Sequence, residues 1–184
     1  MGVIGKDFKY KIVKNFLSKD EISLLAVYME IKHRLNTTKF DFVQSDNADT
    51  KFYGDPLTDT LLLKKQKLVE SETNKKILPT YSYWRCYTKN ADLKPHKDRP
   101  SCEISVTVNI SGKGENWPIY MEDTPMYLEK GDAALYLGCE ITHSRKKFKG
   151  DHQFQTFLHY VDANGKYVNH YMDKRNFWGM DPSL

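Results

Sequence analysis

The segment Cys102–Ile110, with the sequence CEISVTVNI, alternates apolar and polar side chains over its whole length. Successive side chains of a β-strand point to opposite faces, so this period of two predicts a strand. One face of that strand is apolar and carries Cys102, Ile104, Val106, Val108 and Ile110. The other face is polar and carries Glu103, Ser105, Thr107 and Asn109. The polar face is either wet, as in an open sheet, or lines the cavity of a small barrel.

Short runs of the same kind lie on both sides of this segment and are separated by Gly, Pro, Asn and Asp. Such a series is typical of an antiparallel sandwich or barrel, and eight strands suffice for a jelly roll. The predicted strands are Thr80–Tyr87, Leu93–Asp98, Cys102–Ile110, Pro118–Met121, Met126–Leu128, Ala133–Leu137, Thr142–Ser144 and Gln153–Val161.

The chain before this series begins with a short alternating run and a helix signal. Phe8–Val13 alternates like an edge strand. Ser18 and Glu21 then form a capping box, which predicts the start of a helix that runs to about Leu35. The N-terminal part is therefore expected to contribute helical structure beside the sheets.

A second helix is predicted after a polar segment. Lys39–Gly54 is polar and is expected to form a loop. Asp55 and Pro56 are typical of an N-cap and a first helical position, and they predict a helix that continues through Leu68. The fold class predicted from these patterns is α+β and mainly β.

Composition places the chain among ordinary globular proteins. Its 184 residues predict one domain over residues 1–184, and a net charge of +4 from 28 basic and 24 acidic residues does not require a nucleic-acid partner. Cys86, Cys102 and Cys139 are an odd number without a C-x-x-C pair, so buried free thiols are expected. Neither a membrane-spanning stretch nor a signal peptide is recognisable, which predicts a soluble cytoplasmic or other intracellular protein without membrane contact.

Three polar residues suggest a metal site. His96 and Asp98 are separated by one residue, so in an extended strand both side chains point to the same side. His143 lies 47 residues beyond His96 and could arrive from another strand. Two imidazoles and one carboxylate that leave other positions open suit non-haem Fe(II), which must bind an organic co-substrate and oxygen together. An H-x-D tripeptide also recurs by chance, so the prediction of a metal site depends on the neighbouring segments of the sequence.

Those surroundings resemble the Fe(II)- and 2-oxoglutarate-dependent oxygenases, with a layout closest to the prolyl 4-hydroxylase-like branch. The resemblance covers residues 79–175 and rests on several segments in their order along the chain. They are Arg85–Tyr87 followed by Leu93–Asp98, the core strand Ser105–Ile110, the turn Leu128–Tyr136 before the distal histidine, the closing strand Phe157–Asp162 and the tail Met172–Arg175.

The resemblance implies a double-stranded β-helix, or jelly roll, at about residues 79–175, with a helical part at about residues 1–78 that buttresses the outer sheet. It implies hydroxylation of an unactivated C–H bond coupled to oxidative decarboxylation of 2-oxoglutarate to succinate and carbon dioxide. The implied metal is Fe(II), held by His96, Asp98 and His143. The other implied cofactors are 2-oxoglutarate and O2 as co-substrates, with ascorbate as a further candidate. No catalytic residues beyond the metal ligands are implied, and the expected substrate is a residue such as proline in a peptide or protein rather than a small molecule.

The chain departs from the family at the cation that pairs with the distal carboxylate of 2-oxoglutarate. The family has a basic residue about ten positions after the distal histidine, whereas Gln153 and Gln155 occupy this region here. A buried dicarboxylate requires a cation, and a guanidinium is the best suited. Arg145, two residues after His143, is the preferred candidate, and Arg85 is the other.

Two further residues are candidates for the co-substrate site. Tyr87 has the strand parity of Arg85, so both side chains face the cavity if either does. Tyr87 and Asn109 are then expected to be hydrogen-bond partners of the keto-acid. Two other functions remain open: a jelly-roll module that binds metal or ligand without catalysis, and a cupin-like metalloenzyme that does not use 2-oxoglutarate.

Overall fold

The computed structural model describes residues 8–39 and 48–180. Two long helices, α1 (Lys19–Lys39) and α2 (Pro56–Thr73), and two short 3-10 helices, η1 (Pro100–Cys102) and η2 (Val168–Lys174), accompany the strands. The strands are β1 (Tyr10–Val13), β2 (Ala48–Tyr53), β3 (Ile77–Thr88), β4 (Leu93–His96), β5 (Ile104–Lys113), β6 (Ile119–Met121), β7 (Thr124–Met126), β8 (Ala133–Leu137), β9 (His143–Arg145) and β10 (His152–Asp162).

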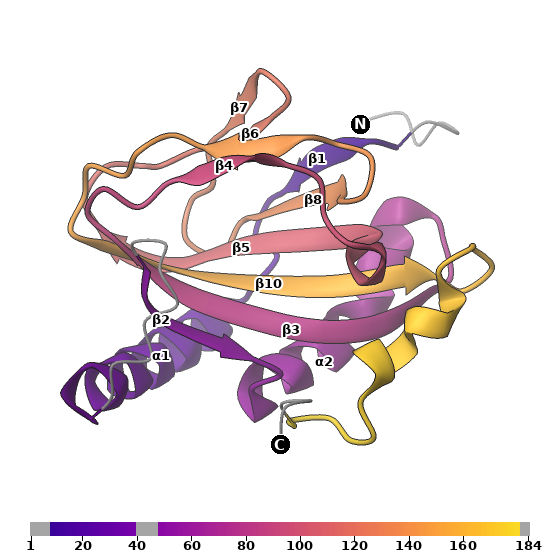
Figure 1. The fold of residues 1–184 in the computed structure, drawn as a ribbon, viewed down its shortest axis with the longest axis horizontal. Coiled ribbons are helices and arrows are strands. Elements are labelled where there is room, and N and C mark those ends of the chain that lie inside the picture. The colour runs from indigo at the N-terminus through magenta and orange to yellow at the C-terminus, as the bar shows by residue number, and fades with distance from the viewer. Residues whose placement is uncertain (1–7, 40–47, 181–184) are drawn as a thin grey trace.

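The strands form two antiparallel sheets that lie over each other (Figure 1). The larger sheet has six strands in the order β1-β8-β5-β10-β3-β2, and the smaller has four in the order β4-β9-β6-β7. The chain crosses between the sheets repeatedly, so that β3, β5, β8 and β10 belong to one sheet and β4, β6, β7 and β9 to the other. This arrangement is the jelly roll that the sequence predicts.

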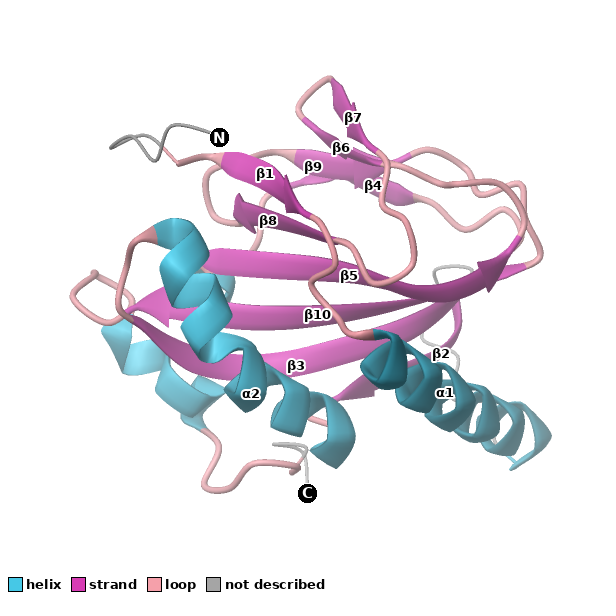
Figure 2. Cartoon of the chain, turned by 180° about the vertical axis from the view of Figure 1, so that it is seen from behind, coloured by secondary structure: helices cyan, strands magenta, loops and turns pink. Residues whose placement is uncertain are grey.

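Both long helices cover the outer face of the six-stranded sheet, on the side away from the smaller sheet (Figure 2). The main apolar core lies between the two helices and the six-stranded sheet. It includes Met29, Leu62, Val69, Trp84, Val106 and Leu158. Burial of apolar surface is the dominant stabilising contribution in such a layer, so the helices anchor the large sheet. The predicted helical buttress is confirmed.

The predicted helix starts are also confirmed. Glu21 Oε2 accepts a hydrogen bond from the backbone N–H of Ser18 at 2.8 Å, and Ser18 Oγ accepts one from the backbone N–H of Glu21 at 3.2 Å. Asp55 Oδ1 accepts a hydrogen bond from the backbone N–H of Leu57 at 3.0 Å. These bonds satisfy amide groups that have no partner inside the helix.

The prediction of a loop over Lys39–Gly54 is wrong at its end, because β2 occupies Ala48–Tyr53. This strand pairs with β3 at the edge of the large sheet, and the Phe52 ring stacks on that of Trp84 with 4.8 Å between centroids. Pairing with a distant strand is a tertiary effect that the local polar composition does not indicate. Residues 40–47 of the predicted loop lie outside the described residues.

Other predicted elements begin or end at different residues in the structure. Helix α1 continues to Lys39, beyond the predicted end near residue 35. Strand β7 ends at Met126, where the predicted strand begins. Cys102 belongs to the turn of η1, so β5 begins at Ile104.

The two faces of β5 separate the apolar core from the interior between the sheets. Ile104, Val106, Val108 and Ile110 belong to the apolar core under the helices. Ser105 and Thr107 point the opposite way and have no exposed surface. The alternative of a wet face is therefore wrong for Ser105 and Thr107, which lie in the interior of the barrel.

The three cysteines are free thiols, of which Cys86 and Cys102 are buried as predicted. The prediction is wrong for Cys139, which lies half-buried in the turn after Gly138. A membrane-spanning helix is absent from the described residues, because neither α1 nor α2 combines the necessary length with the necessary hydropathy.

Candidate metal and ligand site

His96, Asp98 and His143 converge between the two sheets. His96 ends β4 and His143 begins β9, and these residues are directly paired in the small sheet. Asp98 Oδ1 lies 3.7 Å from His96 Nε2 and 3.4 Å from His143 Nε2. One ligand atom from each of the three residues lies within 4.8 Å of the other two. This spacing suits a single metal ion bound by two imidazoles and one carboxylate.

Hydrogen bonds orient both imidazoles. His96 Nδ1 lies 2.8 Å from the carbonyl oxygen of Lys94, and His143 Nδ1 lies 3.0 Å from that of Ile141. A carbonyl oxygen only accepts hydrogen bonds, so each Nδ1 carries a proton, and Nε2 is the nitrogen left on each ring to bind a metal. Both rings are therefore prepared to bind a cation through Nε2.

The carboxylate of Asp98 is held by residues from two other segments. Its backbone N–H donates to the carbonyl oxygen of Gly138 at 2.8 Å, and Ser105 Oγ donates to Oδ2 at 2.9 Å. Burial raises the pKa of Asp98, but the hydrogen bond with His143 and the neighbouring histidine and serine outweigh it, so the pKa lies below its ordinary value. The carboxylate is thus charged at neutral pH, with Oδ1 directed at the two imidazoles.

Gly138 is required by the close approach of its neighbours to the carboxylate. A Cβ at this position would lie 2.3 Å from the carbonyl oxygen of Cys102 and 2.5 Å from Asp98 Oδ2. Such distances are too short for any side chain. The turn that precedes His143 therefore packs directly on the Asp98 carboxylate.

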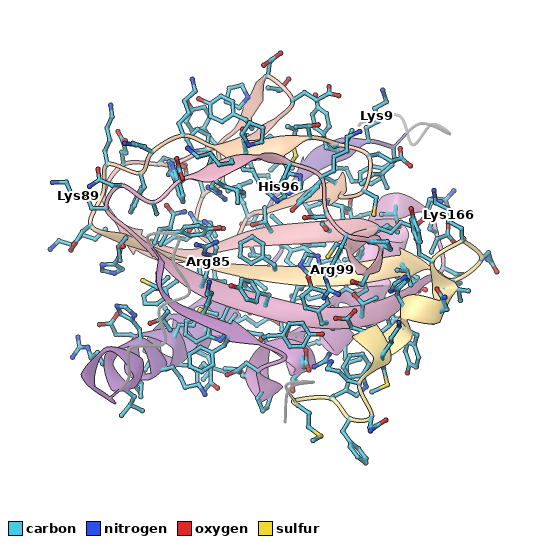
Figure 3. The ribbon with its side chains drawn as sticks, in the orientation of Figure 1. Lys9, Arg85, Lys89, His96, Arg99 and Lys166 are labelled. Carbon is cyan, nitrogen blue, oxygen red and sulfur yellow. The ribbon has the colours of Figure 1, made fainter. Side chains whose placement is uncertain are left out.

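A cavity of about 170 Å³ opens beside the three residues. Its walls come from β3, β4, β6, β8, β9 and β10, and it is lined by Tyr81, Tyr83, Arg85, Tyr87, Leu93, His96, Asp98, Ile119, Tyr136, His143, Phe157 and His159. The contributions of β3 are every second residue, because alternate side chains of this strand face the barrel interior. Figure 3 shows His96 and Arg85 among the side chains between the sheets, contributed from opposite sides.

Arg145 lies behind this cavity on β9, two residues after His143. Its side chain is 3% exposed, its Nη1 donates to the carbonyl oxygen of Trp117 at 2.6 Å, and its guanidinium lies 4.7 Å from the Trp117 ring centroid. Burial lowers the pKa of Arg145 to about 10, so the group is still a cation at neutral pH. Its Nε and Nη2 are buried without a hydrogen-bond partner among the described residues.

Arg85 and Tyr87 both line the cavity, as their shared strand parity predicts. The Arg85 guanidinium lies 4.0 Å from the Tyr87 ring centroid. Nε and Nη2 of Arg85 are also buried without a hydrogen-bond partner among the described residues. The strand β3 thus brings a guanidinium and a phenol to the cavity beside His96, Asp98 and His143, and the guanidinium of Arg145 lies behind it.

Asn109 does not line the metal-side cavity. Its amide Nδ2 donates to the carbonyl oxygen of Leu128 at 2.8 Å, and its Oδ1 accepts from Gln153 Nε2 at 3.3 Å. Asn109 and Gln153 instead line a second cavity near the turn that follows β5. Gln155 is fully buried in the interior, where its Oε1 accepts from Thr107 Oγ1 at 3.4 Å.

Several residues of the site carry no sequence signal of their own. Ser105 joins the Asp98 carboxylate to His159, whose Nδ1 lies 3.0 Å from Ser105 Oγ. Trp117 supports Arg145 from the position just before the predicted strand Pro118–Met121. Strand parity is the one signal that could have found Ser105, because it places Ser105 on the polar face of its strand.

Arg99, next to Asp98, has a structural partner. Its Nη1 donates to Asp173 Oδ1 at 3.0 Å, which connects the metal-side turn to the C-terminal segment. The two side chains form an ion pair.

No family model matches the sequence, and no curated protein sequence matches it. Among solved structures, a viral collagen prolyl hydroxylase from Paramecium bursaria Chlorella virus-1, in a 2-oxoglutarate complex, is similar with a TM-score of 0.65 and 14% identity over 86% of this chain and 98% of that one. HygX from Streptomyces hygroscopicus, with nickel and 2-oxoglutarate bound, has a TM-score of 0.65 and 12% identity over 85% and 83% of the two chains.

A prolyl-4-hydroxylase from Pseudomonas putida is similar to the same extent, with a TM-score of 0.62 and 14% identity over 84% of this chain and 92% of that one. At these identities the comparison concerns the arrangement of the strands and helices. The chain therefore has the jelly-roll fold of these prolyl hydroxylases and of a 2-oxoglutarate-binding protein, as its sequence predicts.

Proposed function

We propose that this protein is an Fe(II)- and 2-oxoglutarate-dependent dioxygenase that hydroxylates a C–H bond. The observation that carries the proposal is the convergence of His96, Asp98 and His143 beside a buried, partnerless guanidinium edge of Arg145. A cation without a counter-ion in the protein interior is costly, so such a group indicates an anionic ligand. Neutral imidazoles with one carboxylate also fit the ligand preferences of non-haem iron.

The residues have separate tasks in this proposal. His96, Asp98 and His143 would hold Fe(II) and leave its remaining positions open. Arg145 would bind the distal carboxylate of 2-oxoglutarate, with Tyr87 beside it. Arg85, the other candidate cation in the sequence, lies on the cavity wall against Tyr87 and is not needed for this contact. When bound, the iron supplies the oxidising chemistry in which 2-oxoglutarate and O2 give succinate, carbon dioxide and a hydroxylated product. The protein's own contribution is to position the reactants and to exclude water.

The proposed substrate is a peptidyl residue such as proline. Support comes from the two similar structures named as prolyl hydroxylases, one of them a collagen prolyl hydroxylase. A small molecule is the less favoured alternative, and HygX, which has been crystallised with hygromycin B, supports it. We expect the protein to act in the cytoplasm and ascorbate to support turnover.

The test is succinate formation by the purified protein with Fe(II), ascorbate and 2-oxoglutarate, with and without proline-containing peptides. We expect succinate from the wild type and none from Asp98→Ala. Arg145→Gln should raise the dissociation constant of 2-oxoglutarate at least tenfold, because a charge-assisted bidentate contact contributes about 1.5–3 kcal/mol. Absence of succinate under all these conditions would contradict the proposal.

A second candidate function is a non-catalytic binding module. The neutral Gln153 and Gln155, at the place where the resemblance implies a cation, favour it. Titration calorimetry separates the candidates: metal-dependent binding of 2-oxoglutarate that disappears in Arg145→Gln supports the dioxygenase. Metal binding without affinity for 2-oxoglutarate supports the module or a cupin-like metalloenzyme.

A further inference from the structure

Two guanidinium groups face the same interior, and both present the same unsatisfied edge. Nε and Nη2 are buried without a hydrogen-bond partner in Arg85 and again in Arg145, among the residues that the structure describes. These two N–H groups lie side by side on one edge of a guanidinium, where they match the two oxygens of a carboxylate. The interior is therefore prepared for two such contacts.

Of the two carboxylates of 2-oxoglutarate, only the distal one is available to a guanidinium group. The other carboxylate belongs to the metal end of the molecule in the proposed function. Arg145 is the deeper group, 3% exposed and fixed against Trp117. Arg85 is only partly buried and lies on the cavity wall, against Tyr87. The deeply buried Arg145 suits 2-oxoglutarate, which is enclosed when bound. Arg85 can instead be reached by a molecule that occupies the cavity.

A charge count supports a second anion. Arg85 and Asp98 are the only Lys, Arg, Asp or Glu residues among the described residues that line the cavity, and Arg145 adds a cation behind it. With a divalent metal and neutral histidines, these groups leave three positive charges. The dianion 2-oxoglutarate neutralises two of them. One positive charge is left for the substrate, in an interior where an unpaired charge is costly.

We infer that Arg85 binds a carboxylate of the substrate, so that this enzyme acts on a carboxylate-bearing molecule. The inference rests on the proposed function and narrows its substrate class. The carboxylate can belong to a free amino acid or related small acid, or to a peptide. In either case the bidentate contact with Arg85 would fix the carboxylate of the substrate in the cavity beside the metal.

Acetate is the probe for this contact, because it is the smallest stable carboxylate with a methyl group and requires no knowledge of the substrate. The protein is loaded with Mn(II) and saturated with 2-oxoglutarate, and its melting temperature is followed against acetate, with chloride at the same ionic strength as reference. We expect saturable stabilisation by acetate, since a ligand that binds the folded state raises its stability. Acetamide should have no such effect.

The variant Arg85→Gln should raise the acetate dissociation constant at least tenfold and change that of 2-oxoglutarate by less than about threefold. Lys89→Gln is the matched control, because it removes a positive charge from an exposed position directly after β3, the strand that carries Arg85 (Figure 3). Acetate binding should survive that change. N-acetylproline and a peptide with a free C-terminal proline, each compared with its amide, then distinguish a small acid from a peptide.

Each other outcome overturns the inference. If acetate stabilises the complex no better than chloride, Arg85 binds no carboxylate. If Arg85→Gln instead weakens 2-oxoglutarate as strongly as Arg145→Gln does, both guanidinium groups serve the co-substrate. Failure of 2-oxoglutarate itself to bind the Mn(II)-loaded wild type is a different result, because it contradicts the proposed function.

Discussion

At the scale of single residues, the site depends on one serine that binds no ligand. Ser105 Oγ donates to Asp98 Oδ2 at 2.9 Å, and it stands 3.0 Å from His159 Nδ1. By engaging Oδ2, the hydroxyl leaves Oδ1 directed toward His96 and His143. Loss of a group that orients a metal ligand typically lowers metal affinity about 10–100-fold.

Ser105→Ala should therefore lower the affinity for Fe(II) about 10–100-fold, because the carboxylate is free to rotate. The measurement is competition with a metal chelator under anaerobic conditions. Ser111→Ala, further along the same strand, is the matched control and should bind metal like the wild type. Equal affinities of the two variants would show that Asp98 needs no support from Ser105.

The candidate site was predictable to the extent that residue types identify chemistry. Two histidines and an aspartate are recognisable as ligands in a sequence, and the structure brings His96, Asp98 and His143 together. The partners of Asn109 were not predictable, because its bonds to Leu128 and Gln153 depend on which turn packs against it. A serine such as Ser105 has no distinctive chemistry until the fold gives it a neighbour.

At the scale of the elements, Glu21 joins the start of α1 to α2. It completes the capping box with Ser18 and accepts hydrogen bonds or ion pairs from Lys64 and Lys65 at 3.0 Å and 2.7 Å. Burial raises the pKa of Glu21, but the hydrogen bonds from Lys65, the Ser18 backbone and Lys64 outweigh this effect and lower the pKa to about 2. The charged form is thus favoured in the folded state.

This shift predicts a pH dependence of stability. The pKa of Glu21 is lower in the folded state than the ordinary value of 4.5, so its contribution is complete above about pH 4.5 and is lost as the pH falls toward 2. Glu21→Gln should cost up to about 1 kcal/mol at pH 7, because the group is partly exposed and screened. Urea unfolding between pH 2 and 7 should show a smaller loss for Glu21→Gln than for the wild type; parallel curves would contradict the assignment.

Elements were predictable where the signal is local. The capping box of Ser18, the N-cap at Asp55 and the alternation of β5 all act within a few residues, and all three agree with the structure. Strand β2 escaped prediction because its stability comes from pairing with β3, including the contact of Phe52 with Trp84. Sequence periodicity carries no information about such a distant partner.

At the scale of the whole molecule, a buried ion pair fastens the C-terminal segment to the body of the fold. Arg175 Nη1 lies 2.7 Å from Asp59 Oδ2, and both side chains are 1% exposed. Asp59 also accepts a hydrogen bond from Ser82 Oγ at 2.7 Å, and Arg175 donates to the carbonyl oxygen of Thr80 at 3.1 Å. The pair therefore connects α2, β3 and the segment after η2.

Arg175→Met should lower the free energy of unfolding by about 3–5 kcal/mol, because it leaves the Asp59 carboxylate buried without its counter-ion. The measurement is the urea midpoint with an unchanged slope. Lys174→Met, at the exposed neighbouring position, should change stability by less than about 0.5 kcal/mol. The double variant Asp59→Leu with Arg175→Met should regain part of the loss; equal losses in single and double variants would exclude an uncompensated charge as the cause.

The pairing of His96 with His143 across two strands has a consequence for how a metal would be bound in the proposed function. The side chains of His96 and His143 meet only after β4 and β9 have paired, whereas the apolar core under the helices contains neither of them. Folding can thus be completed before any metal arrives. In the proposed function, the folded protein would therefore take up its metal as a last step, and adding metal to the folded apo-protein would complete the site without refolding.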